Sequence, residues 1–332
     1  MQKTNLYKKL NLMSIKKDKL VALFQEQLAS WEQAGNNYKA LENVVVKQVE
    51  VKGFPFKVQF NPARIVSSSA KVDTKSIQER RCFLCRENRP AVQKGIDFIY
   101  NGKEGDPYTV LINPFPIFPR HLTIPLLAHT DQLISGRMGA MLSLAKELDG
   151  YTLFYNGPKC GASAPDHFHF QAGNKGFLTI ESQLPLMDKE VLYQKDNEVV
   201  SSVKGVFSGL FSITGKSAGQ VEELFEKIFS VLPVKDGEKE PMVNILCWYQ
   251  QDTYIVLVYV RDKHRPSHYF REGEQNILLS PASVDLGGVL ITPLEKDFKK
   301  MDNMLIEEIL DEISIDKEED LQIIEKIKTI LK

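Results

Sequence analysis

The sequence predicts an α+β fold with an antiparallel sheet, packed helices and two related halves. Short β-rich runs follow one another closely, as in residues 242–248 and 254–260. Helical periodicity separates groups of such runs, most clearly in residues 218–231. A strand-like segment at 288–293, with the charged helix after it, echoes the segment 121–125 and its own helix. This echo suggests that the second half repeats the first.

Length and composition narrow the classes of protein to consider. The chain has 332 residues, 42 Lys+Arg against 43 Asp+Glu, a formal charge of −1 and 43% hydrophobic residues. At roughly 100–200 residues per domain it is long enough for two domains, and its hydrophobic content excludes wholesale disorder. The balanced charge provides no global attraction to nucleic acid or to an acidic membrane, so neither is an expected partner.

The same survey predicts a cytoplasmic protein. No run of about 18 apolar residues predicts a transmembrane helix. Residues 1–19 are rich in lysine and have no apolar segment typical of a secretory signal. Four cysteines in a chain of this length do not make a disulfide scaffold. Two of them, Cys82 and Cys85, are close enough in sequence to need an explanation of their own.

The predicted elements of the first half alternate between helix and strand. Apolar spacing predicts a helix at 17–34 that ends at Gly35-Asn36-Asn37, and strand-like residues follow at 43–60 until Asn61-Pro62 breaks them. Residues 67–80 are polar and predict a loop. The remaining expected elements are strands at 108–112, 121–125, 151–155 and 167–171 and a helix at 130–149.

The second half repeats this style without the histidine motif. Residues 303–331 mix charged and apolar residues in a pattern typical of one or two amphipathic helices. No low-complexity linker separates the halves, so we expect them to pack closely. The predicted organisation is a helical and strand extension at 1–50, a first half with the motifs described below at 51–185, and a second, degenerate half with C-terminal helices at 186–332.

The segment from Tyr155 to Gln171, YNGPKCGASAPDHFHFQ, carries the clearest chemical pattern. On a strand, His167 and His169 point the same way, and Gln171 completes a row of three. The preceding loop is rich in small residues, so its backbone N–H groups can approach a phosphate closely. A neutral imidazole beside such a loop can act as a nucleophile toward phosphorus, provided that an acceptor holds its second ring nitrogen.

This segment resembles the histidine triad (HIT-like) superfamily in its nucleotidyltransferase branch, which includes galactose-1-phosphate uridylyltransferase, diadenosine tetraphosphate phosphorylase and GDP-L-galactose phosphorylase. The motif HFHFQA at 167–172 is most similar to the last of these, and the resemblance covers roughly residues 55–175. It implies a HIT-like antiparallel sheet with packed helices and a covalent nucleotidyl intermediate on His169. Gln171 replaces a third histidine; it can hold a phosphate oxygen but cannot shuttle a proton, which favours transfer to a phosphate-bearing acceptor over hydrolysis.

The pair Cys82 and Cys85, followed by the basic residues of 86–90, resembles the zinc-binding loop of the uridylyltransferases. Zinc needs about four ligands in tetrahedral geometry, and the pair supplies two of them. The resemblance places the other two on a histidine after the central strand and on the first histidine of the triad, which here correspond to His121 and His167. It implies a structural zinc ion that leaves the nucleophile free.

The same resemblance assigns further polar residues to nucleotide and phosphate binding, and it adds Ser163 and His167 to the catalytic set. The binding residues are Asn61, Arg64, Asn113, Asn156, Lys159 and Gly161. Arg81, Arg86 and Arg89 form a local basic cluster that suits phosphate groups. The segment 261–268, which contains two histidines and three basic residues, could deliver charge to a sugar phosphate or an acceptor; a plain polar loop is the alternative.

Plainer interpretations stay open for several of these residues. An arbitrary His-x-His is often a pair of satisfied or exposed histidines, and a Cys-x-x-Cys can be redox-active or fortuitous as well as zinc-binding. Cys160 and Cys247 are expected to be small apolar residues, and His129 to lie near a helix start. Phe168 and Phe170 are expected to point away from the histidines into the core.

The favoured function is that of an enzyme, a nucleotidyltransferase of the phosphorylase type acting on a nucleotide sugar, with a GDP-hexose favoured by the motif. Uridylyl or adenylyl transfer, the latter from a dinucleoside polyphosphate, is the alternative within the class. A zinc-stabilised nucleotide-binding module without turnover is the alternative outside it. The expected partners are the nucleotide and phosphate, and the chain could form a homodimer.

Overall fold

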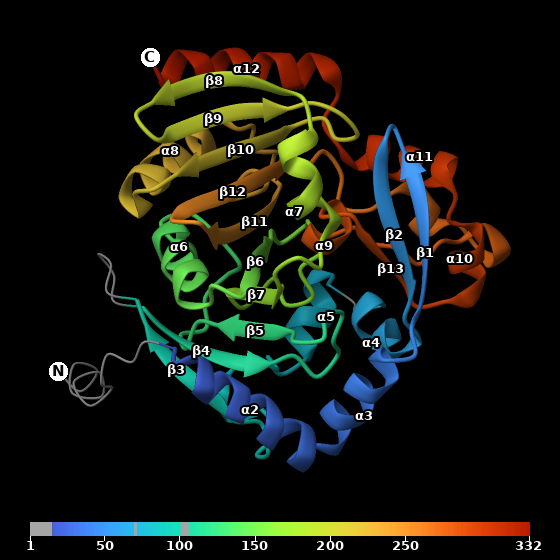
Figure 1. Cartoon of the computed structure of the whole chain (residues 1–332). Coiled ribbons are helices and arrows are strands. Elements are labelled where there is room, and N and C mark those ends of the chain that lie inside the picture. The colour runs from blue at the N-terminus through green and yellow to red at the C-terminus, as the bar shows by residue number, and fades with distance from the viewer. Residues whose placement is uncertain (1–14, 70–71, 101–105) are drawn as a thin grey trace.

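Two sheets organise the chain (Figure 1). The structure is a computed structural model that describes residues 15–69, 72–100 and 106–332. Ten strands form the large sheet in the order β3-β4-β5-β7-β6-β11-β12-β10-β9-β8, and β1-β2-β13 form a small one. Neighbouring strands of the large sheet are antiparallel, whereas β13 lies parallel to β2. The predicted α+β class with an antiparallel sheet is confirmed.

The strands of the large sheet come in two sets of five, and those of the small sheet come from both ends of the chain. The first set is β3 (Gly95–Ile99), β4 (Pro107–Ile112), β5 (Leu122–Pro125), β6 (Tyr151–Asn156) and β7 (His169–Asn174). The second set is β8 (Lys189–Lys195), β9 (Glu198–Val203), β10 (Leu210–Gly215), β11 (Val243–Gln250) and β12 (Thr253–Val260). The small sheet contains β1 (Val45–Val51), β2 (Phe54–Phe60) and β13 (Val289–Thr292).

The helices differ widely in length. The longer ones are α2 (Lys17–Ser30), α3 (Glu32–Leu41), α6 (Met138–Glu147), α8 (Ala218–Val231), α11 (Asn303–Ile313) and α12 (Lys317–Ile330). The shorter ones are α4 (Ile65–Ser68), α5 (Thr74–Glu79), α7 (Thr179–Gln183), α9 (Ser283–Leu286) and α10 (Glu295–Lys300). None of the helices among the described residues is both long enough and apolar enough to cross a membrane.

The two sets of strands have the same topology. Each set runs strand-strand-strand-helix-strand-strand along the chain, with α6 in the first set and α8 in the second. Their spatial orders, β3-β4-β5-β7-β6 and β8-β9-β10-β12-β11, correspond strand by strand, and the sets meet where β6 pairs with β11. This ordering is what two related halves would produce. The boundaries at 50/51 and 185/186 stay predictions, and β1 itself crosses residue 50.

The sequence echo that suggested the repeat is not the structural one. The segment 288–293 contains β13, which leaves the large sheet and pairs with β2. The strand that occupies the place of β5 in the second half is β10. The echo was misleading because a short apolar run ending in Thr-Pro fits any buried strand and carries no information about its partner.

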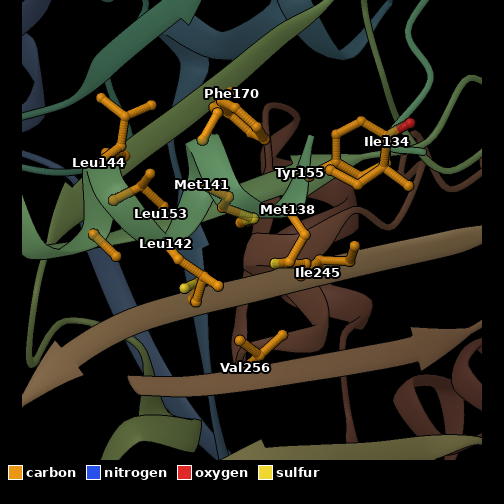
Figure 2. Close-up of a cluster of buried hydrophobic side chains, with 14 of the residues drawn as sticks. Ile134, Met138, Met141, Leu142, Leu144, Leu153, Tyr155, Phe170, Ile245 and Val256 are labelled. Atoms are coloured by element: carbon orange, nitrogen blue, oxygen red, sulfur yellow. The ribbon is translucent and has the colours of Figure 1, made fainter. Parts of the chain in front are cut away.

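A hydrophobic core lies on each face of the large sheet. Figure 2 shows one of them, in which Met138 and Met141 of α6 lie near Ile245 and Val256 of β11 and β12. The helices α6 and α8 cover this face (Figure 1). Phe170 also belongs to this core, and because side chains alternate along β7, His169 and Gln171 point to the opposite face.

The opposite core lies between the large and the small sheet. Phe56 of β2 and Leu290 of β13 pack there with Leu246 and Trp248 of β11, and all four are fully or almost fully buried. The small sheet therefore packs against the face of the large sheet on which the side chains of His169 and Gln171 lie. Predicted core positions Phe168 and Phe170 are both fully buried, which confirms their assignment.

Several element boundaries differ from the prediction for identifiable reasons. The helix expected at 17–34 is two helices that turn at Trp31, and Gly35 lies inside the second one rather than after the first. A Cβ on Gly35 would lie 2.6 Å from the carbonyl oxygen of Leu28, so glycine permits the corner between them. The first 14 residues of the predicted extension at 1–50 lie outside the described residues.

At two more places the observed element differs from the predicted one where a carboxylate accepts hydrogen bonds from backbone N–H groups. The loop predicted at 67–80 contains α5, whose first turn is capped because the Asp73 carboxylate accepts a bond from the Ser76 N–H at 3.0 Å. The helix predicted at 130–149 begins only at Met138. Before it, the N–H groups of Ile134 and Ser135 donate to the Glu240 carboxylate at 2.9 and 2.7 Å, which holds this segment outside the helix.

Candidate active site and metal cluster

His169 is the first residue of β7 and is only 4% exposed. Its Nδ1 lies 2.9 Å from the carbonyl oxygen of His167. A carbonyl can only accept, so Nδ1 carries the proton and Nε2 retains its lone pair. Burial lowers the pKa of His169 to about 4, so the ring is neutral near pH 7. This is the tautomer that nucleophilic attack by Nε2 requires.

Gln132 holds the backbone of His169 from both sides. Its side-chain Oε1 accepts from the His169 N–H at 2.8 Å, and its Nε2 donates to the His169 carbonyl at 2.9 Å. The same Nε2 lies 3.1 Å from the carbonyl of Asn156 on the neighbouring strand. Gln132 is fully buried. It was missed by sequence analysis because these contacts join segments 37 residues apart, and the local sequence carries no sign of them.

Gln171 lies two residues further along β7, and its amide orientation is fixed by two donors. Its Oε1 lies 3.1 Å from Nε2 of His121 and 3.4 Å from Nδ2 of Asn113. Nδ1 of His121 accepts from the Ile117 N–H at 3.2 Å, so the proton of this ring is on Nε2 and points at Gln171. Since the amide oxygen is occupied, the NH₂ end of Gln171 is the one left to donate to a ligand.

This arrangement gives His121 a different place from the predicted one. Burial and the nearby Arg64 lower its pKa to about 3, and both of its ring nitrogens are engaged in the hydrogen bonds just described. It does not lie with the cysteines, contrary to the predicted zinc ligation. His121 precedes β5, whereas the histidine that follows this strand is His129. The criterion of a histidine after the central strand therefore selects His129, because His121 stands before β5 and not after it.

Four side chains from three segments converge to form a cluster that could hold a metal ion: Cys82, Cys85, His129 and His167. Their ligand atoms all lie within 4.8 Å of one another. The Sγ of Cys82 lies 3.2 Å from Nδ1 of His167, and the Sγ of Cys85 lies 3.2 Å from Nδ1 of His129. In a tetrahedral zinc site the sulfur and nitrogen atoms are about 3.5 Å apart, given bonds of about 2.3 and 2.0–2.1 Å.

The tautomer of His167 suits ligation. Its Nε2 lies 2.8 Å from the carbonyl oxygen of Leu126, so Nε2 carries the proton and the Nδ1 lone pair faces the cysteines. His167 lies two residues before β7, so it does not join the predicted row of three side chains on the strand. Its ring points to the cluster while its carbonyl holds His169, and the residue thus connects the two sites.

The loop that presents the cysteines is held by its own polar residues. Asn88 donates to the carbonyl of Cys82 at 2.9 Å, and Arg89 donates to the carbonyl of Leu84 through two nitrogens at 2.9 and 2.7 Å. Arg86 pairs with Asp97 at 2.6 Å. Arg86 and Arg89 were predicted to bind phosphate. The contacts described here instead give both residues a part in holding the cysteine loop. Arg81 is exposed.

A cavity of about 540 Å³ lies in front of His169. Its polar end is formed by His169, Gln171, Ser163 and Asn113. The rest of its wall is largely apolar and includes Trp31, Val66, Phe83, Leu84 and Phe115. Arg80 also lines it, pairs with Asp166 and lies 5.0 Å from the centre of the Phe83 ring. The cavity is of a size that takes a whole small-molecule ligand, with a planar apolar part and a polar group near the imidazole.

The other predicted binding residues fall into two groups. Arg64, Asn156 and Gly161 line a second, smaller cavity that shares Asn113, Ser163 and Gln171 with the first. Asn61 is buried and donates to Gln59 and to the carbonyl of Pro116, at 3.2 and 3.3 Å. Lys159 is ion-paired with Glu238 on the surface. Neither Asn61 nor Lys159 lines either cavity, contrary to their predicted roles.

Comparison with known proteins agrees with this architecture. The sequence profile of a family described as a domain of unknown function (DUF4922) matches residues 23–174, which contain the site. No curated protein has significant sequence similarity to the chain.

The solved structures with a similar fold include crystal structures of yeast Ap4A phosphorylase Apa2. One of them has a TM-score of 0.56 and 14% identity, and the match covers 86% of this chain and 96% of that chain. The same enzyme in complex with Ap4A has a TM-score of 0.54 and 15% identity, with 86% and 97% covered. Its complex with AMP gives 0.54 and 16%, with 87% and 97% covered. At these identities the similarity establishes the fold alone: an α+β fold with a large antiparallel sheet, shared with yeast Ap4A phosphorylase.

Proposed function

We propose that this protein is a nucleotidyltransferase of the phosphorylase type that uses His169 as its nucleophile. The observation that carries the proposal is the hydrogen bond from Nδ1 of His169 to the carbonyl of His167, which leaves the Nε2 lone pair free in a ring that lines a ligand-sized cavity. In the first step a bond forms between Nε2 and the α-phosphorus of a nucleotide. The bond from that phosphorus to the bridging oxygen breaks, and the leaving phosphate takes the electron pair.

The second step reverses the first with another phosphate. An oxygen of the acceptor attacks the α-phosphorus, the bond to Nε2 breaks and the neutral imidazole is regenerated, while the proton on Nδ1 stays in place throughout. The NH₂ group of Gln171 and the hydroxyl of Ser163 would donate to the non-bridging oxygens as charge develops there. Because an amide cannot take a proton from water, a phosphate that is already ionised is the better acceptor.

The substrate class proposed first is a nucleotide sugar of the GDP-hexose type, on the strength of the motif HFHFQ. The second candidate is a dinucleoside polyphosphate, favoured by the shared fold with yeast Ap4A phosphorylase. The apolar wall with Trp31, Phe83 and Phe115 suits stacking of either purine base. Uridylyl transfer is the remaining member of the same class.

We also propose that Cys82, Cys85, His129 and His167 hold a zinc ion. The donor set of two thiols and two imidazoles, the spacing of the donor atoms and the tautomer of His167 fit a closed tetrahedral site. Four protein ligands leave no position for substrate, so the ion would tie the cysteine loop to the segment before β7. The ion would stabilise this region and take no part in the chemistry.

The intact mass of the protein tests the main proposal. After incubation with GDP-, UDP- and ADP-hexoses and with Ap4A, we expect a mass increase of one nucleotidyl group with at least one donor. Addition of inorganic phosphate should then discharge the adduct as the corresponding nucleoside diphosphate, which is ADP where the adduct is adenylyl. A protein that binds these nucleotides but forms neither adduct nor phosphate-dependent product, in zinc-replete form, would instead be a binding module.

A charge change at Gln171 tests the role given to its amide. Gln171→Glu keeps the shape but removes two donors and adds a negative charge beside the transferred phosphate. We expect the rate of adduct formation to fall by about 10²- to 10³-fold, as for loss of an oxyanion-stabilising donor. Gln194→Glu, on the exposed surface of β8, makes the same change away from the site and should keep the wild-type rate. Equal rates for all three proteins would show that Gln171 does not contact the phosphate.

A further inference from the structure

The smaller cavity, of about 110 Å³, is built from both halves of the chain. The first half contributes Arg64, Ser163 and Gln171, and the second contributes His264, Arg265 and Ser280. Ser163 and Gln171 also line the larger cavity that contains His169, so the two cavities share a wall. A volume this far below the roughly 300 Å³ of a typical ligand site suits one chemical group rather than a whole ligand.

Two of the residues that line this cavity each have a buried nitrogen atom that lacks a hydrogen-bond partner within the described part of the chain. These atoms are Nε of Arg64 and Nε2 of His264. The rest of the wall is already organised: Nη1 of Arg64 donates to the carbonyl of Phe115 at 2.6 Å, and Nε of Arg265 donates to Oγ of Ser280 at 3.1 Å. Nε of Arg64 is a donor in every state of the guanidinium, and buried donors are rarely left unpaired because each costs free energy, so this one points to a ligand with acceptor atoms. Nε2 of His264 is a second donor in the tautomer that has its proton on that nitrogen.

The charges of the cavity favour an anion. Arg64 and Arg265 bring two positive charges, and among the described residues that line the cavity Asp285 alone is acidic. Both oxygens of Asp285 already accept backbone N–H groups, from Ala282 at 2.8 Å and from Ile291 at 3.1 Å. His264 is neutral near pH 7, because burial and the neighbouring Arg265 lower its pKa to about 4. Arg265 is further held by its position 4.0 Å from the centre of the Tyr269 ring.

We propose that this cavity is the subsite for the second phosphate of the reaction, the group that leaves from the α-phosphorus and the acceptor that later attacks it. The inference rests on the proposed function and assigns to the second half a binding role in it. A phosphate group has the small size, negative charge and several acceptor oxygens that the cavity requires. The shared wall of Ser163 and Gln171 places it next to the α-phosphate at His169.

The same subsite serves both half-reactions. The first step leaves a phosphate, either free or on a sugar or nucleotide, and the second step uses a phosphate in the reverse direction, so both groups approach the α-phosphorus from the same side. The segment 261–268, for which the sequence left a charged and a plain interpretation open, supplies His264 and Arg265 to this cavity. The second half would thus select the acceptor while the first half carries the nucleophile.

The test uses the adduct isolated after incubation with excess donor. We chase it with inorganic phosphate and, separately, with a hexose 1-phosphate, and measure the concentration that gives half the maximal rate of discharge. Arg265→Gln should raise this concentration about 10- to 100-fold, the effect of losing a charge-assisted hydrogen bond, and His264→Asn should raise it severalfold. The acceptor with the greater change identifies which phosphate the subsite prefers. Ser280→Ala, a milder change that removes the acceptor of Arg265 Nε from the cavity wall, should also raise the half-saturating concentration and covers the case in which Arg265→Gln unfolds.

Arg271→Gln is the matched control, because it removes the same charge from an exposed arginine that faces Glu308 at 3.9 Å and lines neither cavity. An unchanged half-saturating phosphate concentration in Arg265→Gln would overturn the subsite. Line broadening of the ³¹P signal of inorganic phosphate by the resting protein gives an independent readout, which should weaken in Arg265→Gln but not in Arg271→Gln. Binding of this kind without any adduct would refute the proposed function and leave the cavity as a phosphate-binding site without a transfer reaction. An adduct with equal phosphate binding by all variants would support the proposed function and overturn the subsite.

Discussion

Replacing His169 by alanine is expected to abolish the nucleotidyl-enzyme adduct and to lower the rate of transfer by about 10³-fold or more, since no covalent intermediate can then form. The physical reason is that the two ring nitrogens have different roles: Nδ1 donates to the His167 carbonyl, and Nε2 keeps the lone pair that attacks phosphorus. Intact mass after incubation with each donor measures the adduct. Discharge by inorganic phosphate, followed as release of nucleoside diphosphate, measures the transfer.

The matched control for this variant is Cys160→Ala. Cys160 is a buried free thiol in the loop before β7, so it is a second candidate nucleophile close to the site in sequence. Burial raises its pKa to about 11, which leaves the thiol protonated, and the adduct should persist without it. An adduct that survives in His169→Ala but disappears in Cys160→Ala would transfer the role of nucleophile to the cysteine. Thermal unfolding of both variants verifies that each is folded.

The parts of the fold that could be predicted are those whose signal is local. The helix predicted at 218–231 coincides with α8, because its apolar residues follow the helical repeat along its whole length. The antiparallel pair β11 and β12 was also predictable, because two apolar runs flank a short polar turn. In that turn Gln251 and Asp252 both have positive φ, the conformation that a two-residue hairpin turn demands.

The parts that could not be predicted depend on which segments meet. The pairing of β13 with β2 joins residues more than 200 positions apart, and the apolar run of β13 fits either sheet equally well. The corner between α2 and α3 was hidden for a related reason, because a glycine that allows a close contact has the same sequence signal as one that ends a helix.

In the candidate site, too, some residues have a local sequence signal and others depend on which segments meet in the fold. His169 and Gln171 share a face of β7 because of the two-residue repeat of a strand, which the sequence displays directly. Gln132 and the true surroundings of His121 require tertiary structure, since their partners lie 37 and 50 residues away. His129 could have been found, because it is the histidine that follows β5 and the strand predicted at 121–125 already ended where β5 ends.

The proposed zinc ion and the proposed nucleophile are connected through one residue. His167 points its Nδ1 to the cysteines, donates from its Nε2 to the Leu126 carbonyl and accepts from His169 through its own carbonyl oxygen. A displacement of this residue therefore removes the acceptor that fixes the tautomer of His169. Loss of metal should act on transfer through the position of His167 and the tautomer of His169, because an ion with four protein ligands would have no direct part in the chemistry.

The double variant Cys82→Ser with Cys85→Ser is therefore expected to lose one zinc ion per chain, to unfold at a temperature lower by on the order of 10 °C and to form the adduct about 10- to 100-fold more slowly. Metal analysis of the purified protein measures the first effect, and calorimetry and intact mass measure the others. Cys160→Ala with Cys247→Ala removes two thiols outside the cluster and should retain the metal. An unchanged metal content in the serine variant would refute the site. Loss of metal with an unchanged rate would show instead that His167 holds His169 by hydrogen bonding alone.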